Sequence, residues 1–577
     1  MLRAAHRSAA ELELALGDPL DPAARVSLGA LLEADEREEP PAAAFDALRD
    51  WGFHAHLVPE ECGGRLTSFD ELLALVRVVS RRDLVLTTGL GSTLLSAIPI
   101  WIWGSGDQRR WLAARLRDSG AFGCFAVSER DAGSDFRATS TTATQDGGGY
   151  TLRGEKWLIG NASRCAYAVV LARCGRSLSL FLAVPDELTP GTFRRLPRIR
   201  TVGLRGHDLG GMAFEGCALP ETALLEPAGR GMEMALTALQ YTRTMIAGMA
   251  LGAADTALRI AVGWARTRTL YGRPILAIPA VRDLLLGGFL DILTGECVAL
   301  VAARALTLAP RRTSLWAAVA KYLVPHLCER ATRDAGSVLS ARSYLREGVA
   351  GGGFQKVARD VAITSIFEGT ELVQLALIAS QLRQLAAAGQ LFAPGERGDV
   401  ARLCRLDAPA PRWEPRATRL RISDPGGDEL VDCLLGGEPD GWPDCERPVA
   451  AELRAHRDAL RGEALALRAG LAARPAAEPD LETARRYCLV HAAACCLEVW
   501  RHSRGLLGDE AAAGAWLALC LARLRDRLGG APAAPAGLTA DACAWMLREF
   551  EDGELFSIAP FALATATAEE SPCGPRS

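Results

Sequence analysis

The order of secondary-structure patterns along the 577-residue chain is the feature that most restricts its fold. Residues 1–120 carry apolar residues at helical spacing, whereas residues 121–228 change to short β-rich runs separated by Gly, Asp and Pro. Long helical patterns return over residues 229–388. This order excludes a doubly wound α/β sheet, in which strands and helices alternate. We predict a mainly helical α+β protein, with a small antiparallel β-domain after an N-terminal helical domain.

The rest of the chain predicts a connector and one more helical domain. Residues 389–450 are rich in Pro, Gly and Asp and show little periodicity, and residues 451–577 are helical again. The stretch from Leu84 to Gly106 carries no charge and is long enough to span a membrane. Glycines and a proline interrupt it, so we expect a buried helix and its exit loop, with no membrane span.

Composition excludes several classes of protein. The net charge is −4, so no basic field points to nucleic acid or to an anionic membrane. The sixteen cysteines include no C-x-x-C pair, and the eight histidines are scattered without an H-E-x-x-H motif. We therefore predict neither a disulfide scaffold nor a metal site. The N-terminus lacks the apolar core of a signal peptide, which predicts a cytoplasmic location.

Two segments of the β-rich region have residues suited to a ligand. In CFAVSERDAGSDFRA a strand leads to Ser128 and Glu129 and then to a small-residue loop. There Gly133 would let a ligand approach the backbone, and Ser134 could donate to an anionic group such as a pyrophosphate. An ordinary β-turn explains the same loop equally well. The second segment, GEKWLIGN, ends in Gly-Asn, which permits a bulge or the close approach of a flat ring.

A single glutamate stands out in the segment TSIFEGTELV. Glu368 follows Ile366 and Phe367, and a carboxylate beside apolar residues is costly to desolvate. Such an acid is either turned toward water or kept for a purpose. The simpler interpretation is an acid in the first turn of a helix, where the helix dipole favours it. These residues alone leave both interpretations open.

Taken together, the motifs resemble the acyl-CoA dehydrogenase superfamily over roughly residues 20–385. Five segments are similar to family motifs and occur in the family's order: VPEECGGRL, FAVSERDAGSD, GEKWLIGNA, ARTRTLYGR and ARDVAITSIFEGTELVQ. No G-x-G-x-x-G follows a strand, so a nucleotide would not be held in Rossmann fashion. The resemblance implies a four-helix bundle over residues 229–388 and an FAD between that bundle and the β-domain.

The resemblance also implies a reaction, the α,β-dehydrogenation of an acyl thioester. A carboxylate removes the α-proton while the β-hydrogen leaves as a hydride to the flavin. Glu368 is the implied catalytic base, because the family's second position for this acid is Thr242 here. Apolar shielding would raise its pKa toward that of a weakly acidic C–H. Gly369 is implied to leave room for the thioester and to offer its N–H to the developing enolate.

Further site residues are implied by their match to family positions. Substrate contacts fall on Arg243, Gly369 and Ser134. The implied FAD contacts are Phe125, Val127, Ser128, Gly133, Ser134, Leu158, Gly160, Arg268 and Thr370. Arg268 resembles an arginine that reaches the FAD of a neighbouring subunit, which implies a homodimer or homotetramer.

Departures from the family pattern leave the electron acceptor open. The usual Trp-Ile-Thr is Leu158-Ile159-Gly160 here, and a glycine at this place resembles some acyl-CoA oxidases and could open space for O2. The acceptor is then either an electron-transferring flavoprotein or O2.

A third reading is a flavin-binding relative that associates with DNA and no longer dehydrogenates, against which Glu368 and the acidic C-terminal region count. Residues 451–577 resemble the helical extensions of very-long-chain dehydrogenases and acyl-CoA oxidases. The acyl chain length, and the choice between coenzyme A and a carrier-protein tether, do not follow from the sequence.

Overall fold

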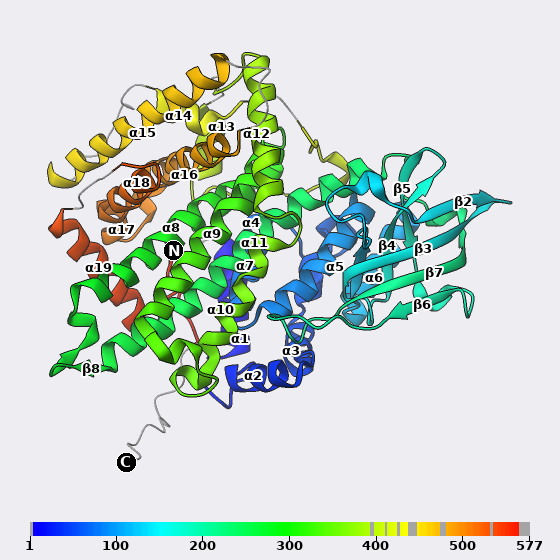
Figure 1. Cartoon of the computed structure of the whole chain (residues 1–577), viewed down its shortest axis with the longest axis horizontal. Coiled ribbons are helices and arrows are strands. Elements are labelled where there is room, and N and C mark those ends of the chain that lie inside the picture. The colour runs from blue at the N-terminus through cyan, green and yellow to red at the C-terminus, as the bar shows by residue number, and fades with distance from the viewer. Residues whose placement is uncertain are drawn as a thin grey trace.

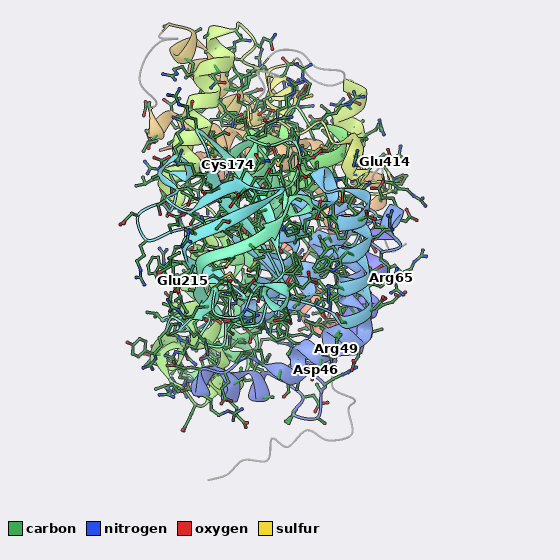
Figure 2. All side chains as sticks on the ribbon, turned by 90° about the vertical axis from the view of Figure 1, so that its right-hand side faces the viewer. Asp46, Arg49, Arg65, Cys174, Glu215 and Glu414 are labelled. Carbon is green, nitrogen blue, oxygen red and sulfur yellow. The ribbon has the colours of Figure 1, made fainter. Side chains whose placement is uncertain are left out.

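The computed structural model shows a helical body with a β-sheet at one end (Figure 1). It describes residues 4–392, 397–409, 412–423, 427–436, 447–473, 480–530 and 535–564. The sheet faces the viewer in Figure 2, with Cys174 and Glu215 on its strands and Asp46, Arg49 and Arg65 on the N-terminal helical part beside it. The described residues confirm the predicted mainly helical α+β class.

In the described part of the chain, six α-helices precede the sheet. They are α1 (Ala4–Leu16), α2 (Leu28–Arg37), α3 (Ala42–Trp51), α4 (Phe69–Ser80), α5 (Leu84–Trp103) and α6 (Gly106–Ser119), with a 3-10 turn, η1 (Phe53–Leu57), between α3 and α4. Helix α5 begins where the side chain of Asp83 accepts a hydrogen bond from the backbone N–H of Val85 at 2.8 Å. Nearly all of its side chains are buried, so the prediction of a buried helix is confirmed.

Four helical stretches among the described residues are long and apolar enough to cross a membrane. In α5, α7 (Gly231–Thr267) and α8 (Pro279–Leu308), 89–94% of the most apolar window is buried inside the fold. In the fourth stretch, Val349–Ala387, the buried share is 28%. The apolar side chains of α5, α7 and α8 therefore fill the protein's own core.

The sheet is mixed, which corrects the prediction of an antiparallel one. Its strands are β1 (Gly123–Ala126), β2 (Thr142–Asp146), β3 (Gly149–Gly160), β4 (Tyr167–Cys174), β5 (Ser177–Ala183), β6 (Phe193–Leu196) and β7 (Leu209–Pro220). Their order is β1-β4-β2-β3-β7-β6, with β5 on β4. Strand β1 pairs with β4 in parallel, because the chain makes the β2–β3 hairpin before it returns beside β1. Alternation of residue types along single strands does not reveal such a crossover.

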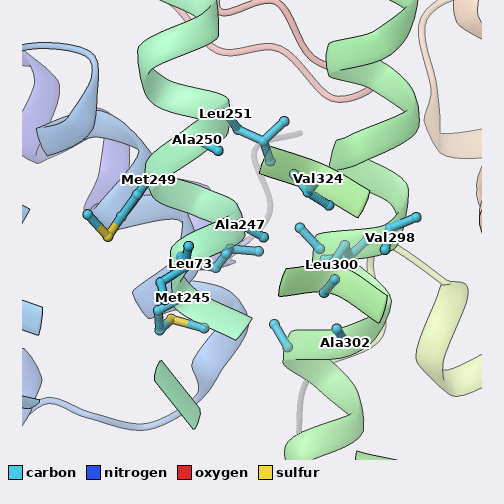
Figure 3. Close-up of a cluster of buried hydrophobic side chains, with 14 of the residues drawn as sticks. Leu73, Met245, Ala247, Met249, Ala250, Leu251, Val298, Leu300, Ala302 and Val324 are labelled. Atoms are coloured by element: carbon cyan, nitrogen blue, oxygen red, sulfur yellow. The ribbon is translucent and has the colours of Figure 1, made fainter. Parts of the chain in front are cut away.

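Three long helices and three shorter ones form the second helical part. They are α7, α8, α9 (Thr313–Leu339), α10 (Gly353–Val361), α11 (Ile363–Ile366) and α12 (Glu371–Ala387); the two-residue strands β8 (Thr269–Leu270) and β9 (Arg273–Pro274) follow α7. Figure 3 shows the apolar side chains that fill the space between α7, α8 and α9. Small residues let α4 approach α7 from the other side: a Cβ on Gly248 would lie 2.9 Å from Leu73 Cδ1.

The described residues of the C-terminal part form seven α-helices, which are α13 (Arg397–Cys404), α14 (Glu429–Leu435), α15 (Arg447–Ala473), α16 (Leu481–Ser503), α17 (Asp509–Ala513), α18 (Ala515–Arg527) and α19 (Ala536–Glu551). The first two lie in the segment expected to be a plain connector. This segment also contacts both earlier helical parts of the chain. The Trp413 backbone N–H donates to the Thr67 carbonyl at 2.8 Å, and the Trp413 indole donates to the hydroxyl of Tyr241 on α7 at 3.2 Å.

Candidate active site

Glu368 lies in the turn between α11 and α12, with an unusual backbone. Its φ is +55°, and that of Gly369 is +102°. A residue other than glycine in the left-handed region costs about 1–3 kcal/mol and persists only where its surroundings hold it. Here Arg243 Nε donates to the Glu368 carbonyl at 3.0 Å, and the Gln374 amide donates to the carbonyls of both turn residues at 3.2 Å. The turn is fixed from two sides.

Thr242 holds the carboxylate of Glu368. Its hydroxyl donates to Glu368 Oε2 at 2.5 Å, from a position 126 residues earlier in the chain. Burial raises the pKa of Glu368, while the Thr242 hydrogen bond and the charges of Arg243 and Lys321 lower it in part, so that the net shift is upward. The structure thus brings Glu368 and Arg243 together as the resemblance implied, and gives Thr242 a role that the sequence did not predict.

Lys321 is a site residue that the sequence analysis missed. It lies on α9, fully buried, and its ammonium donates to the Thr364 carbonyl at 2.7 Å. Burial lowers the pKa of Lys321 to about 8, although the nearby Glu368 charge raises it. Lysine is rare in this chain, with only Lys156, Lys321 and Lys356. The signal in the sequence that could have indicated this residue is a single lysine within an apolar helical run.

One expectation about the neighbours of Glu368 is wrong, because Ile366 is 54% exposed and does not shield the carboxylate. A Cβ on Gly369 would lie 2.5 Å from Gln374 Nε2. Glycine is required at 369 by its positive φ and by this close approach. The room that Gly369 is expected to leave for a thioester stays a prediction.

A small apolar cavity of about 30 Å³ opens beside Glu368. Phe367 and Thr242 lie with Glu368 among its lining residues. The other lining residues come from four segments: Met245, Ile246 and Met249 from α7, Leu72 and Val76 from α4, Thr87, Thr88, Leu90, Gly91 and Leu94 from α5, and Phe53 and Leu57 from η1. Figure 3 shows Met245 and Met249 on the side of α7 that faces away from α8 and α9. The shielding of Glu368 comes from these residues.

The predicted ligand loop and strand lie together at the end of the sheet. The Trp157 backbone N–H donates to the Ser128 carbonyl at 3.0 Å, which ties the loop after β1 to β3. Phe125 and Val127 are buried, whereas Gly133 and Ser134 are exposed at the tip of the loop.

Strand β3 is irregular at its end, as the Gly-Asn pair predicted. The register shifts between Trp157 and Ile159, and Leu158 adopts a φ of +57°. Its side chain is 43% exposed. A strained, exposed apolar residue next to an open loop fits a face that receives a flat apolar ring.

Glu129, which the sequence analysis grouped with the ligand loop, instead holds that loop in place. Its carboxylate accepts hydrogen bonds from the backbone and hydroxyl groups of Ser140 and Thr141 at 2.5–3.0 Å, and from the Lys156 ammonium at 2.8 Å. Burial alone would raise the pKa of Glu129, but these donors lower it to about 2. All its acceptor capacity is used within the protein.

Gly160 does not open space, contrary to the expectation from its match to oxidases. A Cβ at this position would lie 2.4 Å from Ser92 Oγ and 3.2 Å from His207 Nε2. Burial, and then the charges of Arg164 and Arg198, lower the pKa of His207 to about 3, so the imidazole is neutral at pH 7. The place of the family's threonine is thus filled by a hydroxyl from α5 and a neutral imidazole.

Arg268 lies far from the other predicted cofactor contacts. It is the C-cap of α7 directly before β8, which Figure 1 shows at the opposite end of the molecule from the sheet. Thr370 stands between Glu368 and α12, where it is exposed and its hydroxyl makes no capping bond to the helix. Within the described ranges, no group of three or more His, Cys, Asp or Glu side chains could hold a metal ion.

Fold and site together define the class of this protein. A shielded carboxylate stands at one end of an apolar cavity, and the sheet presents an exposed loop and a bulged strand suited to a flat cofactor. Such a site suits the removal of a proton from an apolar substrate beside that cofactor.

Comparison with known proteins specifies the family. Residues 24–118, 124–217 and 229–383 match the N-terminal, middle and C-terminal domains of acyl-CoA dehydrogenases. The human mitochondrial short-chain specific acyl-CoA dehydrogenase is 31% identical over 360 residues, which cover 61% of this chain and 84% of that protein. The probable acyl-CoA dehydrogenase YngJ of Bacillus subtilis is 29% identical over 356 residues, 60% and 91% of the two chains.

The C-terminal part also has a structural counterpart. The crystal structure of an acyl-CoA dehydrogenase complexed with FAD from Bacillus anthracis superposes on 96% of this chain and 95% of its own, with a TM-score of 0.71 and 15% identity. The fold of the described residues, C-terminal helices included, is therefore a known one. The chain belongs to the acyl-CoA dehydrogenase family.

Proposed function

We propose that this protein is an FAD-dependent dehydrogenase of acyl thioesters and that Glu368 is its catalytic base. The observation that carries the proposal is the Glu368 carboxylate, which has a raised pKa, faces an apolar cavity and is fixed by Thr242. A base with a raised pKa is suited to a weakly acidic C–H next to a thioester carbonyl.

The residues present fit an FAD at the end of the sheet. Phe125, Val127 and Leu158 offer apolar surface to the ring, and the half-buried Ser128 leads to an exposed loop, with Gly133 and Ser134, that is suited to its phosphates. When bound, FAD supplies the acceptor for the hydride that leaves the β-carbon of the substrate. Glu368 takes the α-proton, and the apolar cavity keeps water from competing for it.

The turn also provides a donor for the charge that develops on the thioester oxygen. The Gly369 N–H donates to no acceptor among the residues that the structure describes, while the Glu368 and Gly369 carbonyls are both held by neighbours. A fixed N–H of this kind stabilises an enolate oxygen without reorganising.

For the electron acceptor, the proposal is an electron-transferring flavoprotein. The argument for O2 was open space at Gly160, and Ser92 and His207 fill that space. We also propose a homodimer, because Arg268 caps α7 directly before β8, at the opposite end of the molecule from the sheet, where it would serve the cofactor of a partner subunit.

The test is anaerobic bleaching of the flavin by acyl-CoA thioesters. Glu368→Gln should lower the bleaching rate by about 10²–10⁴, the usual contribution of a general base, and leave the FAD content unchanged. Glu371→Gln is the matched control, because this nearby carboxylate on α12 pairs with His326 and Arg485 instead. Full-rate bleaching by the Glu368 variant would remove the assignment, and peroxide formed under air without another acceptor would favour an oxidase.

A further inference from the structure

Three residues from separate parts of the chain meet at the end of strand β3, and we call them the Gly160 cluster. They are Gly160 of β3, Ser92 of α5 and His207, which lies shortly before β7. We propose that the side chains of Ser92 and His207 hydrogen-bond the ring of the cofactor at this place and thereby favour its reduction. This inference rests on the proposed function, because it assumes an FAD at the end of the sheet.

The two polar side chains converge on one point beside Gly160. A Cβ built on this glycine would lie 2.4 Å from Ser92 Oγ and 3.2 Å from His207 Nε2. The backbone does not demand a glycine here, because the φ of Gly160 lies outside the left-handed region. A larger residue at this position would displace the hydroxyl and the imidazole. Glycine therefore leaves this place to the two polar groups, two residues away from the exposed Leu158.

Helix α5 connects the Gly160 cluster to the cavity beside Glu368. Thr88 and Gly91 of this helix line the cavity, and Ser92 is the next residue along. The Ser92 hydroxyl donates to the Thr88 carbonyl at 3.0 Å, so the two residues lie one helical turn, about 6 Å, apart along the helix. A ring held at the cluster would therefore lie close to the substrate whose proton Glu368 removes.

The imidazole of His207 provides a donor of fixed position. His207 is 6% exposed, and its Nδ1 atom is buried with no hydrogen-bond partner among the described residues. Because its pKa is lowered to about 3, the ring is neutral at pH 7 and carries a single N–H. A buried N–H without an acceptor is costly, so we assign the hydrogen to Nε2, the ring nitrogen nearest to Gly160. His207 thus offers an N–H to a ligand at the cluster.

The hydroxyl of Ser92 provides an acceptor. Its hydrogen is used at the Thr88 carbonyl, and its oxygen keeps two lone pairs. The flavin nitrogen that receives a hydride carries a hydrogen only in the reduced ring, and reduction also makes the carbonyl edge of the ring richer in electrons. Ser92 would accept from that N–H, and His207 would donate to that edge. Both contacts are stronger in the reduced ring, so loss of either should make reduction less favourable.

Asn161 fixes the Gly160 cluster before any ligand binds. Its side-chain amide donates to the Gly89 carbonyl of α5 at 2.8 Å. Its backbone N–H donates at 2.7 Å to the carbonyl of Asp208, the residue directly after His207. The end of β3 is thus tied both to α5 and to the segment before β7. Polar groups held in this way need not reorganise when the charge of a ligand changes.

The experiment measures the reduction potential of FAD in the purified holoenzyme by anaerobic titration against redox dyes. Ser92→Ala and His207→Leu should each shift the equilibrium about tenfold toward oxidised FAD, which corresponds to a potential lower by about 30 mV. His207→Gln keeps an N–H donor and should shift the potential less than His207→Leu. Ser96→Ala is the control on the same helix, because the Ser96 hydroxyl contacts Tyr167 at 3.1 Å instead and should leave the potential unchanged.

The dissociation constants of oxidised and reduced FAD, measured by equilibrium dialysis, separate a contact with the ring from a structural role. Ser92→Ala should fold, because alanine suits a helix. It should weaken the binding of reduced FAD about tenfold and leave that of oxidised FAD within about twofold. Equal weakening of both forms would show that Ser92 only supports the local structure and would overturn the inference.

The outcomes also separate this inference from the proposed function. Unchanged potentials in both variants, with FAD bound and bleached by acyl-CoA thioesters, would overturn the inference and leave the proposed function standing. Potentials that shift as expected, in a protein whose flavin no acyl-CoA thioester bleaches, would support the Gly160 cluster and remove the proposed reaction. Wild-type protein without affinity for FAD would overturn both.

Discussion

The chemistry of this protein depends on how one carboxylate is balanced between burial and its partners. Burial raises the pKa of Glu368, and Thr242, Arg243 and Lys321 oppose that shift. Among the residues that the structure describes, Thr242 alone donates a hydrogen bond to the carboxylate itself, at 2.5 Å, while Arg243 holds the backbone behind it. Thr242 is therefore the positioning residue whose loss should be most visible in the pH dependence.

We expect Thr242→Val to shift the pH profile of flavin reduction to higher pH. The base must be ionised to act, so the rate falls when the pH drops below the pKa of Glu368. Removal of a hydrogen bond to the ionised form raises this pKa further, by about 1–2 units for a bond to a charged group. The acidic limb of the profile, measured by stopped-flow bleaching, should move upward by that amount.

Thr244→Val provides the control on the same helix. The Thr244 hydroxyl is buried too, but it donates to the Gln240 carbonyl at 2.9 Å and not to Glu368. If both variants moved the acidic limb equally, the effect would come from a general change in α7, and Thr242 would lose its assigned role.

At the scale of elements, the loop after β1 owes its shape to an internal ion pair. The Glu129 carboxylate accepts hydrogen bonds from Ser140, Thr141 and Lys156. The ammonium of Lys156 also donates to the Val127 carbonyl at 3.2 Å. Both charged groups are buried. The loop that we assign to the cofactor is thus built before any ligand binds, which lowers the cost of binding.

Glu129→Gln should weaken FAD binding and lower the stability of the FAD-free protein. The substitution keeps the size of the side chain but leaves the Lys156 charge buried without an anion, a change that costs about 3–5 kcal/mol. Fluorescence titration with FAD and thermal unfolding measure the two effects. Glu155→Gln, in an exposed pair with Arg130, should change neither by more than about 0.5 kcal/mol. Unchanged FAD affinity in the Glu129 variant would contradict the role given to this loop.

At the scale of the whole molecule, buried carboxylates join segments from both ends of the chain, through an ion pair and through hydrogen bonds. Arg77 of α4 pairs with Glu296 of α8 at 2.9 Å, and the same carboxylate accepts from the Ser557 hydroxyl at 2.6 Å and the Ile558 backbone N–H at 2.9 Å. The Phe556 backbone N–H donates to Asp255 of α7 at 3.1 Å. The C-terminal residues are thus part of the core of the second helical part, not an added surface layer.

Glu296→Gln should therefore destabilise the entire protein. Arg77 would remain buried without its anion, at a cost of about 3–5 kcal/mol. Thermal unfolding at pH 7 should show a clearly lower midpoint for the whole cooperative transition. Glu510→Gln removes an exposed partner of Arg548 and should cost less than about 1 kcal/mol. A separate early transition confined to the extension would show that this part folds independently.

Sequence patterns predicted much of the fold and the centre of the site. Helical spacing and β-rich runs gave the order of helices and strands, and the contiguous motifs placed Glu368 and the loop around Ser134. The parallel pairing of β1 with β4 was missed, because pairing partners depend on a crossover of the chain and not on residue types along one strand. Lys321 and the true role of Glu129 were missed for a similar reason, since their partners lie elsewhere in the sequence.

What the sequence determined by itself is therefore local: which segments are helices or strands, and which short motifs carry an acid, a hydroxyl or a glycine. Only the tertiary structure decided what these groups do. It placed Thr242 on a carboxylate 126 residues away, and it filled the space at Gly160 with Ser92 and His207. The physical reason is that pKa shifts, free space and hydrogen bonds depend on distances between segments that packing alone brings together.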